Sequence, residues 1–371
     1  MADGTAIEWT DATWNVINGC SVKSPGCAKC YAMRLAGTRL KHVDSREGLT
    51  IDTKAGPVWN GTTKFNEPVL LDPIRWKRAR RIFVCAHGDL FHESVPDEWI
   101  DRVFAVMALA PQHQFQVLTK RSARMREYFA APDLYARVLG RANEIRRMSK
   151  HLSRLGDVGV SNPADGWKWV WLGVSVEDQT RAAERIPDLL ATPAAVRWLS
   201  CEPLLGPVDL SGLMFREEEC PNWEMEGSTP PIDPETGARE CCTHCDYTGV
   251  VSVPAIDWIV AGGESGPGAR PMHPDWARSL RDQCAAAGVA FLFKQWGAWL
   301  PWEPDQLPYF KSQTGELIDR HEMPTDFDDA TAKGWSDARL YDGDDICVHQ
   351  RVGKKAAGRE LDGVIHDGFP A

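Results

Sequence analysis

The sequence lacks a hydrophobic run long enough to cross a membrane. None of its apolar stretches approaches the ~20 residues that a membrane-spanning helix needs, so we expect no membrane association. The N-terminus is polar and acidic rather than that of a signal peptide, so we expect a cytoplasmic protein with reduced cysteines. The sequence has no internal repeats, which excludes a repeat protein. It also has no G-x-G-x-x-G segment at the start of a helix, so the dinucleotide-binding fingerprint is missing.

An excess of positive charge is missing as well. The 371 residues include 42 Lys and Arg against 52 Asp and Glu, a net charge of −10. This balance argues against a protein that coats nucleic acid by bulk electrostatics. Local basic clusters remain at residues 75–81, 120–126 and 146–154. They are either solvated helix faces or a local basic groove.

What the sequence does contain is a group of three cysteines on one short loop. Cys20, Cys27 and Cys30 fall within eleven residues. A structural zinc site is usually closed by four ligands, whereas a [4Fe–4S] cluster held by three cysteines keeps one iron free for a small molecule. The loop therefore favours a metal centre with an open position. The alternatives are a zinc knuckle completed by a distant His or Cys, and reduced cysteines that bind nothing.

The loop resembles the cluster loop of radical S-adenosylmethionine (SAM) enzymes, which is usually C-x3-C-x2-C with an aromatic residue before the last cysteine. Here the spacing is C-x6-C-x2-C, and the aromatic residue, Tyr31, follows the last cysteine. A larger part of the chain resembles a phage-associated three-cysteine family of uncharacterised proteins regarded as radical-SAM-like. The matching segments are residues 7–15, 115–121, 171–179, 200–210, 261–271 and 293–297.

The resemblance implies an enzyme with a [4Fe–4S] cluster on Cys20, Cys27 and Cys30 and with S-adenosyl-L-methionine as its second cofactor. The reduced cluster would cleave SAM, and the resulting 5′-deoxyadenosyl radical would abstract a hydrogen atom from the substrate. The resemblance also implies an electron donor of the flavodoxin or ferredoxin type. The phage association and the basic segments favour a nucleobase, nucleotide or nucleic-acid substrate.

Residues 14 to 300 alternate short apolar runs with longer amphipathic stretches. Strands are predicted at residues 14–18, 82–85, 114–118, 170–174, 196–199, 258–261 and 290–293. Helices are predicted at residues 31–40, 96–110, 122–129, 179–190 and 276–287. This alternation predicts an α/β fold, a partial or distorted (β/α) barrel of six to seven parallel strands over residues 1–300.

Three segments interrupt or follow the alternation. We expect a basic helical insertion at residues 130–168, a small cysteine-rich insertion at residues 211–255 and a C-terminal extension at residues 301–371. The cysteine-rich insertion looks in part like a zinc ribbon, with Zn²⁺ as the predicted metal. Its cysteines are Cys220, Cys241, Cys242 and Cys245. An auxiliary iron–sulfur cluster and no metal are the alternatives.

In (β/α) barrels, catalytic residues gather at the C-terminal ends of the strands. Every predicted strand here is followed by residues able to bind or ionise. The candidates for catalysis are Asp89, Lys120, Glu202 and Lys294. The candidates for cofactor binding are Ser175, Glu177, Gly262, Gly263 and Glu264. The last three form a Gly-Gly-Glu motif, which binds the SAM amino group in radical SAM enzymes but there follows the second strand, not the sixth.

Two other functions are consistent with parts of the sequence. A non-catalytic zinc-containing nucleic-acid-binding protein would use both cysteine groups and would not need the strand-end carboxylates. A zinc hydrolase on a barrel has little support, because His87 and His92 are the only close histidine pair near a strand end and lack a metal-binding spacing. The set of strand-end residues favours the enzyme.

Overall fold

The computed structural model describes residues 5, 7–148, 161–219, 250–302, 309–311, 317–319, 339–341 and 347–370. The four cysteines of the predicted zinc-binding insertion lie outside these residues. Among the helices of the described ranges, none has the length and apolar character needed to cross a membrane.

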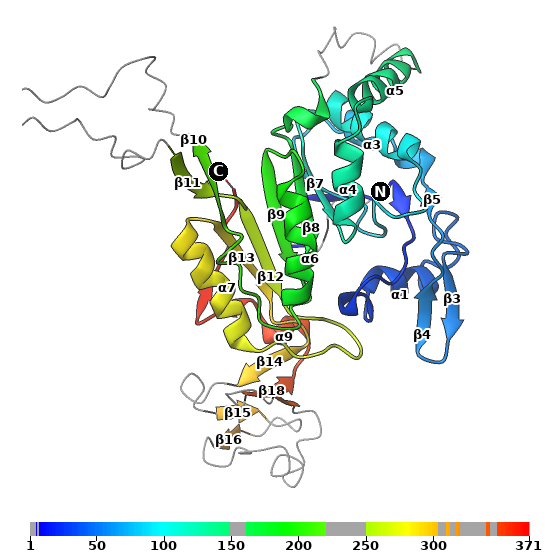
Figure 1. The fold of residues 1–371 in the computed structure, drawn as a ribbon. Coiled ribbons are helices and arrows are strands. Elements are labelled where there is room, and N and C mark those ends of the chain that lie inside the picture. The colour runs from blue at the N-terminus through cyan, green and yellow to red at the C-terminus, as the bar shows by residue number, and fades with distance from the viewer. Residues whose placement is uncertain are drawn as a thin grey trace, which may run out of the picture.

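Seven parallel strands form a curled sheet, a half-barrel (Figure 1). The strands are β1 (Ala12–Trp14), β6 (Arg81–Val84), β7 (Gln114–Thr119), β8 (Val170–Ser175), β9 (Val196–Cys201), β12 (Trp258–Gly262) and β13 (Ala290–Gln295). Each pairs in parallel with its neighbour along the chain. The predicted α/β fold with a partial parallel barrel is therefore confirmed, and the six strands after the first lie where the sequence placed them.

Helices connect the strands, and all but the first cover the outer face of the sheet or pack on the helices that do (Figure 1). They are α1 (Tyr31–Gly37), α2 (Asp72–Arg75), α3 (Asp97–Leu109), α4 (Ser122–Phe129), α5 (Leu134–Met148), α6 (Gln179–Leu190) and α7 (Pro274–Ala287). The five predicted helices are confirmed, with small changes at their ends. Helix α6 begins where the Asp178 side chain accepts the Arg181 N–H, and α7 ends at Gly288 in a left-handed conformation.

The first predicted strand, residues 14–18, is wrong in its bounds. Strand β1 ends at Trp14. Two residues later a second short strand, β2 (Ile17–Asn18), begins outside the sheet and pairs with β5 (Lys64–Phe65). The chain turns at Asn15, whose side-chain oxygen accepts the N–H of His87 at 3.0 Å. This turn directs the cysteine loop over the C-terminal ends of the strands.

Side chains alternate across each strand, so the half-barrel has two cores. In β12, Ile259 and Ala261 pack under the helices, while Val260 belongs to the interior core. The interior core is rich in aromatic residues from the N-terminal ends of the strands and the segment before β1. Its tryptophans are Trp9, Trp171, Trp198 and Trp258. They contact one another edge to face and fill this end of the half-barrel, which we call the floor.

The remaining strands lie outside the half-barrel. They form antiparallel pairs or a small three-stranded sheet and are β3 (Thr50–Thr53), β4 (Gly56–Trp59), β10 (Phe215–Glu219), β11 (Val250–Pro254), β14 (Trp299–Trp302), β15 (Tyr309–Lys311), β16 (Leu317–Asp319), β17 (Arg339–Tyr341), β18 (Cys347–Arg351), β19 (Glu360–Leu361) and β20 (Val364–Ile365). The β3–β4 hairpin flanks α1. A short helix, α9 (Lys354–Ala357), follows β18.

The last described residues pack against the half-barrel. His366 accepts the N–H of Phe293 at 3.0 Å, and the N–H of Gly368 donates to Phe291 at 2.9 Å, so this segment covers the outer edge of β13. Phe369 then stacks on Trp258 with ring centroids 5.1 Å apart. The covered edge removes unpaired backbone groups that would otherwise be open to another chain.

Candidate active site

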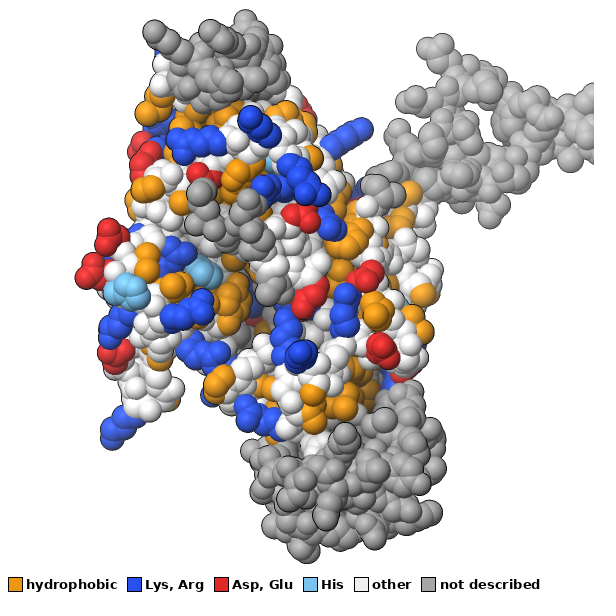
Figure 2. Space-filling view, turned by 180° about the vertical axis from the view of Figure 1, so that it is seen from behind, with side chains coloured by type: hydrophobic (Ala, Val, Ile, Leu, Met, Phe, Trp, Pro, Cys, Tyr) orange, Lys and Arg blue, Asp and Glu red, His pale blue; other side chains and the backbone are white. Residues whose placement is uncertain are grey.

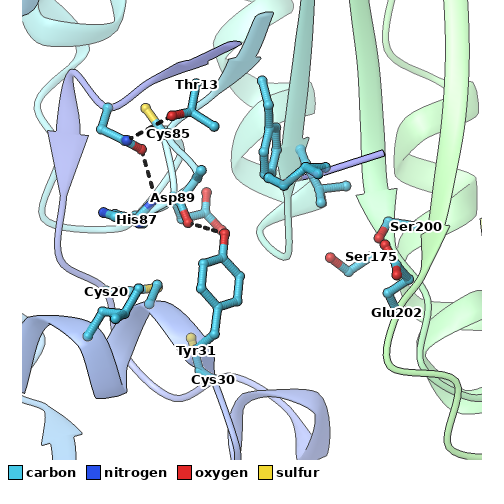
Figure 3. Close-up of a pocket in the computed structure, with 18 of the residues that line it drawn as sticks. Thr13, Cys20, Cys30, Tyr31, Cys85, His87, Asp89, Ser175, Ser200 and Glu202 are labelled. Atoms are coloured by element: carbon cyan, nitrogen blue, oxygen red, sulfur yellow. Dashed lines mark hydrogen bonds between the residues drawn. The ribbon is translucent and has the colours of Figure 1, made fainter. Parts of the chain in front are cut away.

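A cavity of about 870 Å³ lies among the loops that follow the strands. Cys20, Cys30 and Tyr31 lie on one side of it, and the side chains of Ser175 and Glu202 lie on the other (Figure 3). The volume falls within the range of sites that bind small molecules or cofactors. The tryptophan floor closes the opposite end of the half-barrel, so the cavity is reached from the side of the cysteine loop.

The cysteine loop runs from β2 to α1 and brings its three thiols to this cavity. Cys20, Cys27 and Cys30 are free thiols, and all three line the cavity. Burial, with a smaller contribution from Asp89, raises the pKa of Cys20 to about 12, and burial also raises the pKa of Cys30. Sulfurs in such surroundings ionise readily only when a metal centre binds them.

The three thiols of the loop are side chains that could hold a metal group at this cavity. Within the described ranges, no three His, Cys, Asp or Glu side chains lie close enough together to hold a single metal ion. Zinc needs four ligands about 2–2.3 Å away, whereas a four-iron cluster spreads its cysteine ligands over several metals. Three thiols on one loop at one cavity are the kind of ligands that such a cluster would use.

Arg121, at the end of β7, holds the first part of the loop. Its Nη1 lies 3.3 Å from the sulfur of Cys20, and its Nη2 donates to the hydroxyl of Ser21 at 2.8 Å. The same hydroxyl lies 2.9 Å from Nε2 of His92. Asp89 accepts from Arg121 at 3.1 Å and also from Thr119 and two backbone N–H groups. Asp89, a predicted catalytic residue, thus positions Arg121.

Glu177, just past β8, holds the middle of the loop. It is fully buried and accepts from the Ser24 hydroxyl at 2.6 Å, from Arg185 at 2.9 Å and from Lys120. Burial acts to raise its pKa, but Lys120 and Arg185 outweigh that effect and lower the pKa to about 2. A Cβ on Gly26 would come within 2.4 Å of the Glu177 carboxylate, so the loop needs glycine there.

Glu264 anchors a third point of the loop through Arg270. Its two oxygens accept from Arg270 Nη2 at 2.7 Å and from Nε at 2.9 Å. Arg270 Nη2 also donates to the carbonyl of Pro25 at 3.1 Å. The Gly-Gly-Glu segment and the cysteine loop are therefore joined, and both oxygens of Glu264 are occupied by Arg270.

Most of the predicted site residues line the cavity. They are Asp89, Lys120, Glu202 and Lys294 from the catalytic set and Ser175, Gly263 and Glu264 from the cofactor set. Glu177 and Gly262 lie behind its wall. A side chain at position 262 would place its Cβ 2.7 Å from the carboxylate of Glu202, so glycine is needed there. Gly263 packs directly on the backbone of Trp296. The roles of these residues stay predictions.

The wall opposite the cysteines carries polar groups that a ligand can use. Lys294 pairs with Glu202 at 3.0 Å, and both side chains are mostly buried. Gln295 and Trp9 also line the cavity, and in the described part of the chain the buried Oε1 of Gln295 and Nε1 of Trp9 have no hydrogen-bond partner. The Lys294–Glu202 pair makes this wall polar.

Sequence reasoning missed Ser24, Arg185 and Arg270, which hold the loop from behind. A signal existed only for Arg185, which shares the apolar face of α6 with Ala182 and Ile186. A cation on such a face needs a buried partner. For Ser24 and Arg270 the sequence carries no such signal.

The family of proteins of unknown function DUF5131 matches residues 4–370. The chain belongs to this family. The match covers the cysteine loop, all seven strands of the half-barrel and the segment that covers β13, so the cavity and the floor are parts of one DUF5131 unit. Among curated proteins and among solved structures, no match was found.

His87 gives this DUF5131 chain a testable pH dependence. Burial, and then Arg46 at 2.9 Å from Nδ1, lowers the pKa of His87 from 6.5 to about 4. Protonation therefore favours the unfolded chain, and the stability contributed by neutral His87 is complete above pH 6.5 and declines as the pH falls toward 4. We expect His87→Asn to reduce the slope of unfolding free energy against pH in this window by up to about 1.4 kcal/mol per pH unit.

Urea unfolding of the wild type and of His87→Asn between pH 7 and 4 measures this slope. His42→Asn is the matched control, because His42 is exposed. Equal slopes for the wild type and His87→Asn would show that His87 is charged in the folded protein.

Proposed function

We propose that the protein is an iron–sulfur enzyme of the radical SAM type, which reductively cleaves S-adenosylmethionine. One observation carries the proposal. The three thiols of a single loop share a cavity with strand-end polar groups, and Ser175 and Glu202 lie across from Cys20 and Cys30. A purely structural metal site would not need a ligand-sized cavity with a polar opposite wall.

In this proposal Cys20, Cys27 and Cys30 hold a [4Fe–4S] cluster. When bound, such a cluster would supply the single electron, received from a flavodoxin- or ferredoxin-type donor, that the reductive cleavage of SAM needs. Arg121 donates to the sulfur of Cys20 at 3.3 Å, a contact of the kind that adjusts cluster potentials.

The remaining cavity residues bind and orient the reactants. Ser175, Gly263 and Glu264 are the residues proposed to bind SAM, and the Arg270 contact of Glu264 would have to rearrange for Glu264 to accept an ammonium group. Glu202 and Lys294 are an ion pair that can hold a polar substrate and donate or accept a proton. The aromatic floor excludes water from the far end of the cavity.

Anaerobic reconstitution of the full chain with iron and sulfide tests the proposal. We expect about four irons per chain at the three cysteines, and an EPR signal after dithionite reduction that changes when SAM is added. Zinc at the loop, without iron and without an effect of SAM, would contradict the proposal and favour the non-catalytic zinc-containing nucleic-acid-binding protein.

A further inference from the structure

The segment that carries the cysteine loop has a charge unlike that of the rest of the chain. Residues 12–43 contain no Asp or Glu, although the whole chain has a net charge of −10. The segment forms β1, β2, the cysteine loop and α1. Its basic residues are Lys23, Lys29, Arg34, Arg39 and Lys41. We call the surface made by Lys29, Arg34 and Arg39 the basic rim.

The basic rim lies at the mouth of the cavity. Lys29 and Arg39 line the cavity. Lys29 and Arg34 also reach the loop after β12 that contains Gly266 and Gly268. A Cβ on Gly268 would lie 3.1 Å from Lys29 Nζ, and a Cβ on Gly266 would lie 3.0 Å from Arg34 Nη2. Within the ranges that the structure describes, no acidic side chain pairs with these three cations. On the lobe that contains α1, Figure 2 shows several Lys and Arg side chains together with a few acidic ones.

The acidic groups of the cavity do not offset this charge, because each of them already has a cation. Arg121 pairs with Asp89, Lys294 with Glu202, Arg270 with Glu264 and Arg75 with Asp72. Among the described residues, Lys29 and Arg39 of the basic rim are therefore cations that line the cavity without an acidic partner. An anionic ligand suits this mouth.

Tyr31 adds a flat apolar surface beside the basic rim. Its hydroxyl donates to the carbonyl of Ala86 at 2.7 Å, and its ring meets His87 edge to face at 6.1 Å. These contacts fix the ring, yet the residue is 48% exposed and lines the cavity. A fixed, exposed aromatic ring between cations is the arrangement on which single-stranded nucleic acids stack a base.

We propose that the substrate of the cavity is a single-stranded segment of nucleic acid. Its phosphates contact Lys29, Arg34 and Arg39, and one base stacks on Tyr31 inside the cavity. That the nucleic acid is a substrate rests on the proposed function, whereas the binding of single-stranded nucleic acid does not. An acidic protein would also be attracted to the basic rim, but its folded surface would make no use of a stacking ring within a cavity.

Fluorescence anisotropy with a labelled single-stranded oligonucleotide, as DNA and as RNA, tests strand binding by the full chain. We expect binding that weakens steeply with salt. Lys29→Glu combined with Arg39→Glu should weaken binding about tenfold or more and reduce the logarithmic salt slope by about two. The control is Arg147→Glu combined with Lys168→Glu, the same charge change at two exposed positions away from the cavity, and it should change binding less than about twofold.

A second pair of variants tests stacking apart from charge. Tyr31→Leu should weaken binding about tenfold, and Tyr31→Phe, which keeps the ring, should retain it. Iron content and the SAM-dependent EPR change, measured on the same preparations, report on the proposed function separately. Lys29 lies in the cysteine loop, so the double charge variant could lose iron. In that case the binding of Arg39→Glu alone, which lies outside the loop, measures the effect of charge.

Three results would overturn the inference. The first is no binding of either oligonucleotide. The second is an equal loss of binding in the control variant. The third is competition by polyglutamate as effective, charge for charge, as that of the oligonucleotide, which would identify an acidic protein as the partner. In each case an intact cluster with its SAM response would leave the proposed function standing.

Discussion

Replacing Cys27 by alanine is expected to reduce the iron content of the reconstituted protein from about four per chain to less than about one. Cys27 is the middle thiol of the loop and is buried at the cavity. Two remaining cysteines cannot hold a four-iron cluster in a protein whose loop supplies three ligands. Any cleavage of SAM should fall with the iron, by several orders of magnitude, because the electron donor to SAM is gone.

Cys284→Ala is the matched control for this change. Cys284 is a fully buried free thiol on the inner face of α7 and does not line the cavity. We expect it to lose some stability and no iron. Iron and sulfide analysis of the two variants side by side gives the answer. Equal iron in Cys27→Ala and the wild type would remove the cysteine loop from the proposal.

Replacing Glu177 by glutamine is expected to destabilise the protein by about 3–5 kcal/mol. The carboxylate and the side chain of Arg185 are both fully buried, so the substitution leaves a buried guanidinium without its counter-charge. The pKa of Glu177, lowered from 4.5 to about 2, means that its contribution is present above pH 4.5 and is lost as the pH falls toward 2. The difference between the variant and the wild type should therefore shrink in acid.

Two further variants separate the ion pair from the anchor of the cysteine loop. Ser24→Ala removes only the 2.6 Å hydrogen bond to Glu177, so it should cost about 1 kcal/mol and speed the release of iron to a chelator. Glu184→Gln, the same chemical change at an exposed position of α6, should alter stability by less than about 0.5 kcal/mol. A Glu177→Gln protein as stable as the wild type would show that Arg185 finds another partner.

The arrangement of the half-barrel could be predicted because each strand has a local signature. The run Val170–Ser175 is apolar, bounded by polar residues and buried on both faces, as a central parallel strand must be. The first strand could not be predicted correctly, because its end depends on a partner far along the chain. Ile17 pairs with Phe65, and the sequence around Ile17 contains no signal for that pairing.

The candidate site, like the fold, could be predicted from the sequence only in part. The barrel rule brought Lys120, Glu202 and Lys294 to one cavity, because the first two directly follow a strand and Lys294 lies near the C-terminal end of β13. The rule says nothing about which neighbour each side chain meets. Glu177, predicted to bind cofactor, lies behind the cavity wall because Lys120 and Arg185 approach it from β7 and α6. Such pairings depend on side-chain directions that only the folded chain defines.

The stacking of Phe369 on Trp258, with Trp9 edge-on to the same indole at 6.0 Å, has a consequence for biosynthesis. The floor joins Trp9 to Phe369 through Trp258, so it can form only after the ribosome has released every residue between the first and the last of these. Until then the tryptophans of the interior core stay accessible to solvent and to chaperones.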